Sequence, residues 1–496
     1  MRLAPPRASA LIESLRGLGY SLPTALADLI DNSIAAGANT VRIDFIWKAD
    51  QSTLTLLDDG TGMDAAGLEQ AMRLGNMSPL QDRNANDLGR FGLGLKTASF
   101  SQARLLTVAT KRSGAKAECL RWDLDFLADP RNDGWFLLEG PAPGSDQHLT
   151  ALDNVEHGTL VILERLDRLV TRGFGPQEFL DSIDRVEAHL AMTFHRFLEG
   201  PAPCLNLVIN GRQVAPWDPF LTGHPGKPWA PPPVSIGENV IVQCHVLPHG
   251  DRLSPKELEA AAGPDGWTSS QGFYLYRNKR LMVAGGWLGL GQGRPWTRDE
   301  AHRLARIRVD FSNSADADWK IDIRKSTARP PVHVRRTLQR LAEETRQRAR
   351  KVFAHRGGSE RRPAGEPVDM VWQSTHSGGG LRYRISRKHE AIAGLISEHP
   401  ELSDRIETML RCVEETVPVQ RIWLDTAEQK ETPLTGFAGE PDQEATRVLE
   451  VMFRTLVLRR GLSPAAARDR LSRTEPFDRF PTLVAALPDL ADEAGA

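Results

Sequence analysis

Cysteine and tyrosine are scarce in this chain of 496 residues, with four of each. The four cysteines lie far apart and include no C-x-x-C pair, so the sequence offers neither a zinc finger nor a disulfide framework. Such cysteine usage is typical of a reducing cytosol. No run of about 18 apolar residues occurs, and the N-terminus lacks the apolar segment of a signal peptide. A cytoplasmic protein without a membrane span is therefore expected.

An excess of charge of either sign is also lacking. The chain has 62 Lys and Arg against 64 Asp and Glu, a net charge of −2, so its overall charge indicates no class of partner. One stretch differs: residues 335–362 carry ten Lys and Arg against three Glu. This stretch is predicted to be a basic helix with a basic tail, suited to phosphate backbones. The alternative is a surface helix with a solvated arginine face.

Hydrophobic patterning divides the chain into four parts. Residues 1–200 alternate helical and strand patterns, which predicts an α+β sandwich with helices on one face of a mixed sheet. Residues 201–335 form a second, α/β region that begins with the strand pattern "LNLVINGRQV". Residues 336–380 read as the basic helix followed by a Pro/Gly/Ser-rich linker. Residues 381–496 are predicted to be a mostly helical domain, and they contain no motif with an assignable chemistry.

Four short motifs follow one another within the first part. Asp28 and Asn32 of "ADLIDN" are four residues apart, so they project from one face of a helix. The stretch "DDGTGMD" (58–64) ends a strand, and "GRFGLGLKTAS" (89–99) leads into a helix. The last motif, "HGTLVIL", places Thr159 at the start of a strand. Alone, each has a structural explanation as a cap, a turn or a strand residue; together and in this order they predict an ATP site.

The third motif and Asn32 suit the phosphates and a metal ion. Glycines before a helix allow backbone N–H groups to approach phosphate oxygens, and the helix dipole favours the anion. Gly89, Gly92 and Gly94 are the candidates, and Lys96 supplies a point charge for a terminal phosphate. The side-chain oxygen of Asn32 is a hard ligand that suits Mg²⁺ bound to phosphates.

The second motif and Asp28 suit the adenine and the attacking water. Asp58, which Gly60 and Gly62 follow, can accept a hydrogen bond from the adenine amino group while Met63 packs on the ring. Asp28 lies one helical turn before Asn32, where a carboxylate can polarise a water molecule.

This set of motifs resembles the GHKL ATPase superfamily, which includes gyrase B, the large heat-shock chaperone, histidine kinases and MutL. The motifs are most similar to the MORC and chaperone-type branch. The resemblance is strong over about residues 15–200, and a weaker likeness to the adjoining transducer domain spans residues 204–332. It implies a Bergerat-type ATPase sandwich, with an ATP lid at about residues 73–92.

The resemblance also assigns roles to the motif residues. It implies that Asn32 is the Mg²⁺ ligand and that Asp58 reads the adenine beside Gly62 and Met63. It further implies that Gly89, Gly92 and Gly94 belong to a phosphate-binding lid, which Lys96 follows. Thr159 is implied to support the water network on the adenine side.

A lysine of the second region is implied to reach the γ-phosphate. The stretch "WKIDIRKSTARPP" occupies the place where MutL- and gyrase-like proteins carry that lysine. Lys325 is the better match and Lys320 the alternative. The competing interpretation is a solvated lysine at a strand end.

Asp28 departs from the family pattern, in which a glutamate at this position is the general base. Aspartate is shorter by one methylene, about 1.5 Å of reach, and a misplacement near 1 Å costs about 10²-fold in rate. Slow hydrolysis with retained ATP binding is therefore expected. Asp31 lies on the next side of the helix and is interpreted as a structural group, with a shared role in activating the water as the alternative.

The resemblance favours a stand-alone, prokaryotic-type member of the MORC and chaperone-like branch. It implies a nucleotide-dependent homodimer that closes as a clamp, in a restriction or antiviral defence system. The basic residues 335–362 make duplex DNA the expected substrate of this clamp. The alternative is a chaperone-like ATPase that remodels a protein client through residues 381–496. A third hypothesis is a nucleotide-sensing scaffold that hardly turns over.

Overall fold

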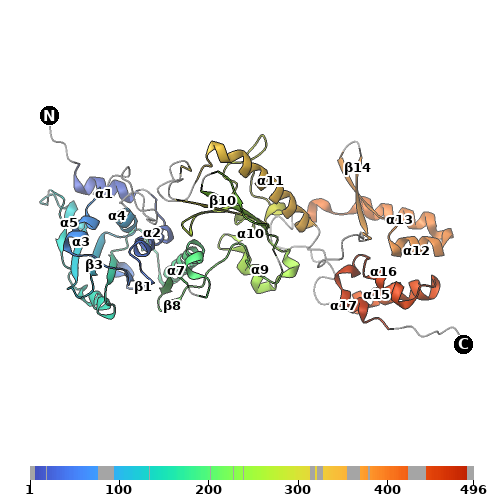
Figure 1. Cartoon of the computed structure of the whole chain (residues 1–496), viewed down its shortest axis with the longest axis horizontal. Helices are drawn as coiled ribbons and strands as arrows, with labels where there is room; N and C mark the ends of the chain where they lie inside the picture. The colour runs from blue at the N-terminus through green and yellow to red at the C-terminus, as the bar shows by residue number, and fades with distance from the viewer. Residues whose placement is uncertain are drawn as a thin grey trace. The chain divides into compact units, whose positions relative to one another are not determined.

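The computed structural model describes twelve stretches of the chain: residues 6–17, 19–75, 94–132, 134–201, 203–226, 228–237, 239–312, 319–320, 328–354, 369–377, 380–422 and 443–488. By its contacts the chain divides into two compact units, residues 1–248 with 253–354, and residues 249–252 with 355–496 (Figure 1). Across these stretches, no helix has the length and apolar character that a membrane span requires.

The first unit contains an eight-stranded sheet in the order β5-β4-β3-β6-β2-β1-β7-β8. Its strands β1 and β7 are parallel and the other neighbours are antiparallel, so the predicted mixed sheet of an α+β fold is confirmed. The strands are β1 (Thr40–Ile46), β2 (Thr53–Asp58), β3 (Leu105–Lys111), β4 (Glu118–Asp123), β5 (Leu138–Glu139), β6 (Gly158–Glu164), β7 (Asn206–Ile209) and β8 (Arg212–Gln213).

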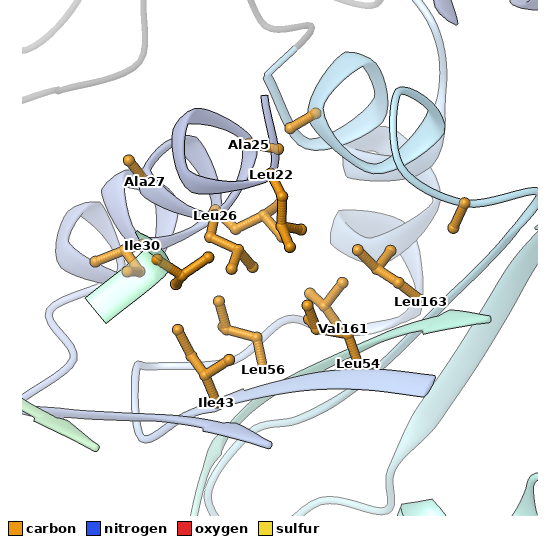
Figure 2. Close-up of a cluster of buried hydrophobic side chains, with 14 of the residues drawn as sticks. Leu22, Ala25, Leu26, Ala27, Ile30, Ile43, Leu54, Leu56, Val161 and Leu163 are labelled. Carbon is orange, nitrogen blue, oxygen red and sulfur yellow. The ribbon is translucent and has the colours of Figure 1, made fainter. Parts of the chain in front are cut away.

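Helices pack on one face of this sheet and close the main core. Apolar side chains of α1, α2, α4 and α7 join those of the central strands in one buried cluster. Figure 2 shows Leu22, Leu26 and Ile30, at a spacing of four residues, directed from α2 toward the strands. This spacing places them on one side of the helix and leaves the opposite side for polar residues. The helices are α1 (Ala8–Arg16), α2 (Leu22–Ala35), α4 (Gly94–Phe100) and α7 (Pro176–Thr193).

The strand pair that begins the second region belongs to the first sheet. Strand β7 pairs in parallel with β1, and β8 pairs with β7, so the sheet continues to Gln213 instead of ending near residue 200. The reason is topological: helix α7 carries the chain back along the sheet, so the next strand enters beside β1 in the same direction.

The second sheet of this unit has the order β12-β11-β13-β10-β9. The long helix α11 (Val332–Ala354) packs on β10 and β13, and its buried residues, such as Leu338 and Ala342, join the core of that sheet. The predicted basic helix is therefore anchored along one side by a hydrophobic stripe. The strands are β9 (Val234–Ser235), β10 (Val240–Val246), β11 (Gly272–Arg277), β12 (Arg280–Ala284) and β13 (Ala305–Phe311).

Where it is described, the second unit is mostly helical, as the sequence predicts, and includes a β-hairpin. Strand β14 (Trp372–Ser377) pairs with β15 (Gly380–Ile385), with Trp372 opposite Ile385. Part of the predicted linker is therefore a strand, since residues 372–377 pair with β15. The described helices are α12 (Glu390–Glu398), α13 (Ser403–Thr416), α15 (Gln443–Arg454), α16 (Pro464–Leu471) and α17 (Pro481–Ala485).

Candidate ATP-binding site

Asp58 lies at the end of β2 with its carboxylate held by three donors. One oxygen, Oδ1, accepts hydrogen bonds from the backbone N–H groups of Gly60 (3.0 Å) and Thr159 (3.2 Å). The other, Oδ2, accepts from the Ser33 hydroxyl at 2.7 Å. Burial raises the pKa of the Asp58 carboxyl above its usual range, although these three hydrogen bonds act in the opposite direction. Sequence reasoning missed Ser33, since a serine in a helix carries no signal of its own.

Two glycines in the turn after Asp58 occupy positions that leave no space for a Cβ atom. Gly62 has φ +65°, and a Cβ atom on it would lie 1.9 Å from the backbone oxygen of Lys111. A Cβ atom on Gly60 would lie 2.9 Å from the Cβ atom of Ala36, the residue after α2. Glycine at these positions therefore brings the turn into contact with both α2 and β3.

Met63 and Thr159 meet at the same turn through a third residue. The backbone N–H of Met63 donates to the hydroxyl of Thr110 at 3.0 Å, and that hydroxyl lies 3.1 Å from the hydroxyl of Thr159. Both Met63 and Thr159 are half-buried. The structure thus brings Asp58, Met63 and Thr159 together where β2 and β3 end beside the start of β6.

The polar residues of α2 are divided between two environments. Asn32 is exposed, whereas Asp28 and Asp31 are buried, with 8% and 1% of their surface accessible. Oδ2 of Asp28 accepts a hydrogen bond from the Tyr20 hydroxyl at 3.1 Å. On the other side, Arg280 of β12 places Nε 2.8 Å from Asp31 Oδ1 and Nη2 3.6 Å from Asp28 Oδ1.

Asp31 is therefore part of a buried ion pair, in line with its interpretation as a structural group. Sequence reasoning missed Arg280, which lies 249 residues away in a second sheet. No local pattern distinguishes it from the neighbouring basic residues of "YRNKR". It also missed Tyr20, just before α2.

Only part of the predicted phosphate loop lies within the described residues. Gly94 is the first residue of α4, whereas Gly89 and Gly92 lie outside the described residues. Lys96 is buried in α4, and its Nζ donates to the backbone oxygen of Ala71 at 2.8 Å. Burial lowers the pKa of Lys96 to about 8. In this arrangement the ammonium group is directed at α3 (Ala65–Met72).

The two candidate lysines of the second region differ in what the structure describes. Lys320 is exposed and adopts φ +47°, next to the buried Trp319. Lys325 lies outside the described residues.

The donors of this site fit Mg²⁺ held jointly by protein and nucleotide. Among the described residues, no group of three or more His, Cys, Asp or Glu is arranged to hold a metal ion. Mg²⁺ commonly takes only one or two protein oxygens and completes its shell with phosphates and water. The exposed carboxamide of Asn32 carries an oxygen of the type that Mg²⁺ binds. When bound, the ion would neutralise phosphate charge.

Comparisons with known proteins identify the domain that carries this site. Residues 20–159 match the family described as histidine kinase-, DNA gyrase B-, and HSP90-like ATPase. The chain is 34% identical over 91 residues to ATPase morc-1 of Caenorhabditis elegans, which covers 18% of this chain and 10% of that protein. It is 40% identical over 80 residues to Protein MICRORCHIDIA 2 of Arabidopsis thaliana, 15% of this chain and 12% of that protein.

The matched stretches thus span only about a tenth of the length of these curated relatives. The family match, residues 20–159, includes α2 and the turn after β2, which build the site described above. Residues 20–159 therefore match the ATPase domain of the GHKL group, the histidine kinase-, DNA gyrase B- and HSP90-like ATPases, and the chain is similar to MORC proteins over 80 to 91 residues.

Proposed function

We propose that the chain binds ATP with Mg²⁺ between α2 and the turn after β2, and hydrolyses it. The anchored carboxylate of Asp58 carries this proposal, because three donors fix it beside a turn in which Gly60 and Gly62 leave no space for a Cβ atom. Asp58 accepts from the adenine amino group, with Met63 against the ring and Thr159 beside them. Asn32 holds Mg²⁺.

The phosphates are bound by the segment that precedes and begins α4. In this proposal Gly89, Gly92 and Gly94 supply backbone N–H groups, Lys96 supplies a charge, and Lys325, or else Lys320, approaches the γ-phosphate. The hydrogen bond of Lys96 to Ala71 means that its side chain must turn away from α3 to do so.

Asp28 polarises the attacking water in the proposed reaction. The water attacks the γ-phosphorus, the bond to the bridging oxygen breaks, ADP leaves, and the carboxylate accepts the proton that the water loses. Turnover is slow because an aspartate stands where the family has a glutamate with a longer reach.

We further propose that ATP closes two copies into a clamp on duplex DNA, in a cytoplasmic defence or restriction system. Helix α11 supports the DNA contact: it exposes Arg335, Arg336, Arg340, Arg348, Arg350 and Lys351. Arg346 is instead buried, with its guanidinium carbon 4.6 Å from the ring centre of Trp287 and 4.9 Å from that of Trp296. Arg348 also lies over the Trp229 ring at 4.3 Å and Arg340 pairs with Glu344 at 2.7 Å, whereas Arg336 and Arg350 are exposed on the helix. The four cysteines, all unpaired, support a reducing compartment.

Stimulation of ATP hydrolysis by duplex DNA tests this clamp. We expect stimulation at low salt and a steep loss of DNA binding as salt rises, because phosphate contacts release counterions. Replacing the exposed Arg336 and Arg350 with glutamate should abolish both effects. The matched control replaces Arg405 and Arg411, exposed on α13, with glutamate. Intact ATP binding without any effect of DNA at low salt would refute the DNA contact.

A protein client is the second candidate. Several apolar side chains of the second unit are open to solvent, among them Met409 (56% exposed), Val451 (60%) and Leu458 (60%). Exposed apolar surface is typical of protein contacts. Client stimulation of ATPase activity, with no response to DNA, would favour this chaperone-like function.

A further inference from the structure

Arg280 connects the second sheet to the helix that carries the proposed catalytic carboxylate. It is the first residue of β12, yet its Nε lies 2.8 Å from Asp31 Oδ1 and its Nη2 3.6 Å from Asp28 Oδ1. Counting side-chain atoms alone, Arg280 is 5% exposed, Asp31 2% and Asp28 9%, so all three side chains are buried. A buried guanidinium with two acidic side chains on one helix is a directional contact, because its N–H groups form a rigid fork.

The guanidinium is held on its own strand as well. Its Nη1 donates to the backbone oxygen of Leu281 at 3.0 Å and lies 3.6 Å from the sulfur of Met282. The position of the charge therefore follows the position of β12. Any shift of β12 relative to α2 moves the guanidinium against Asp28 and Asp31.

Asp28 is held from the opposite side by the ATPase domain itself. The Tyr20 hydroxyl donates to its Oδ2, and the backbone oxygen of Tyr20 accepts a hydrogen bond from the Gln102 side chain at 3.2 Å. One carboxylate oxygen is thus tied to the segment after α4, and the other faces Arg280. The orientation of the carboxylate depends on both contacts.

We propose that Arg280 is a positioning residue for ATP hydrolysis, which sets the orientation of Asp28 according to the position of the second sheet. This inference rests on the proposed function of Asp28. Arg280 pairs directly with Asp31 and faces the nearer oxygen of Asp28. The short side chain of Asp28 makes this orientation more important, because a shorter carboxylate has less freedom to reach the water.

The contact between the two sheets does not depend on Arg280 alone. Arg196 of α8 (His195–Leu198) pairs with Asp310 of β13, and His195 Nε2 lies 2.8 Å from the Tyr276 hydroxyl of β11. These contacts involve neither Asp28 nor Asp31. A variant that removes one of them therefore serves as a control, because it weakens the contact between the sheets and leaves the contacts of α2 unchanged.

Arg280→Gln in the full chain tests the proposal, with Arg196→Gln as the control. We expect Arg280→Gln to lower kcat for ATP about tenfold or more, while the Kd of a fluorescent ATP analogue stays within about threefold of wild type. Arg196→Gln should leave both quantities near wild type. If Arg280→Gln does not fold, as judged by circular dichroism, Arg280→Lys is tested by the same criterion, because lysine keeps the charge but lacks the fork.

Three results would overturn the positioning role. They are an unchanged kcat, an equal fall of kcat in both variants, and a loss of ATP affinity as large as the loss of kcat. The last two would show a general structural effect. A wild-type protein that binds ATP but does not hydrolyse it would overturn the proposed reaction, and the role of Arg280 with it. Wild-type turnover with an unaffected Arg280→Gln variant would overturn the role of Arg280 alone.

Discussion

The Ser33 hydroxyl donates a hydrogen bond of 2.7 Å to Asp58, although the two residues are 25 positions apart. Ser33 directly follows Asn32 in α2, so the helix that presents Asn32 also fixes the carboxylate at the end of β2. The proposed Mg²⁺ ligand and the proposed adenine acceptor are therefore positioned by one helix. A movement of α2 would affect both ends of the nucleotide.

Replacing Asp58 with asparagine should weaken ATP binding by about tenfold to a hundredfold, since a hydrogen bond to a charged group contributes about 1.5–3 kcal/mol. In one of its two orientations, the asparagine amide would also point its NH₂ group at the N–H donors of Gly60 and Thr159, where no hydrogen bond can form. Equilibrium binding of a fluorescent ATP analogue measures the change. Asp59→Asn removes the neighbouring carboxylate, which accepts from the backbone of Asn39 and Thr40, and should leave affinity unchanged. Equal losses in both variants would contradict the assignment.

Replacing Asp28 with alanine should slow single-turnover hydrolysis of ATP by about 10²-fold or more, because it removes the proposed general base. ATP affinity should persist, since Asn32 and Asp58 remain. Asp28→Glu should increase the rate, because it adds the missing reach. Asp44→Ala, on an exposed position of β1, is the control. Equal rates in wild type and Asp28→Ala would exclude Asp28 from catalysis.

Gly62→Ala should destabilise the protein and impair ATP binding far more than Gly37→Ala. Both glycines have positive φ, +65° and +74°, which costs about 1–2 kcal/mol in any alanine variant. Only Gly62 would also drive its Cβ into a backbone oxygen, that of Lys111 at 1.9 Å, whereas a Cβ on Gly37 meets nothing within 4 Å. Thermal unfolding and ATP binding of the two variants measure the difference. Similar melting temperatures would refute the close approach of this turn to β3.

The first unit should lose stability as the pH falls from about 6.5 toward 4. Burial, and then the nearby Arg308, lower the pKa of His245 in β10 to about 4, against about 6.5 in an unfolded chain. Between these values the unfolded state binds more protons than the folded state, so acid favours unfolding. The effect of one such histidine is at most about 3 kcal/mol.

The variant His245→Phe should reduce this pH dependence. Its ring would replace an imidazole that lies 4.4 Å from the Phe220 ring centre and has no hydrogen-bond partner at Nε2 among the described residues. Calorimetric melting temperatures between pH 7 and pH 4.5 provide the measurement. His333→Phe, on an exposed position of α11, is the control. An unchanged pH slope in His245→Phe would show that other groups cause it.

Local patterns were sufficient to predict several parts of this protein. The spacing of Asp28 and Asn32 determines that both project from one side of α2, because an α-helix repeats every 3.6 residues. The alternation of helix and strand patterns predicts the mixed sheet with its covering helices, which the structure confirms. The glycines after Asp58 indicate a tight turn, since only glycine adopts its backbone angles without strain.

Contacts between distant segments were decided only by the tertiary structure. The chain's return along α7 added β7 to the first sheet. The buried Lys96 donates a hydrogen bond to a backbone oxygen of α3. Arg280 pairs with Asp31, although the two residues are 249 positions apart. Hydrophobic periodicity and secondary-structure propensity describe residues within one helix or strand. They do not indicate which buried charged side chains of different elements form a pair. The sequence by itself therefore determined the types of residue at the site, whereas packing decided what surrounds Asp28.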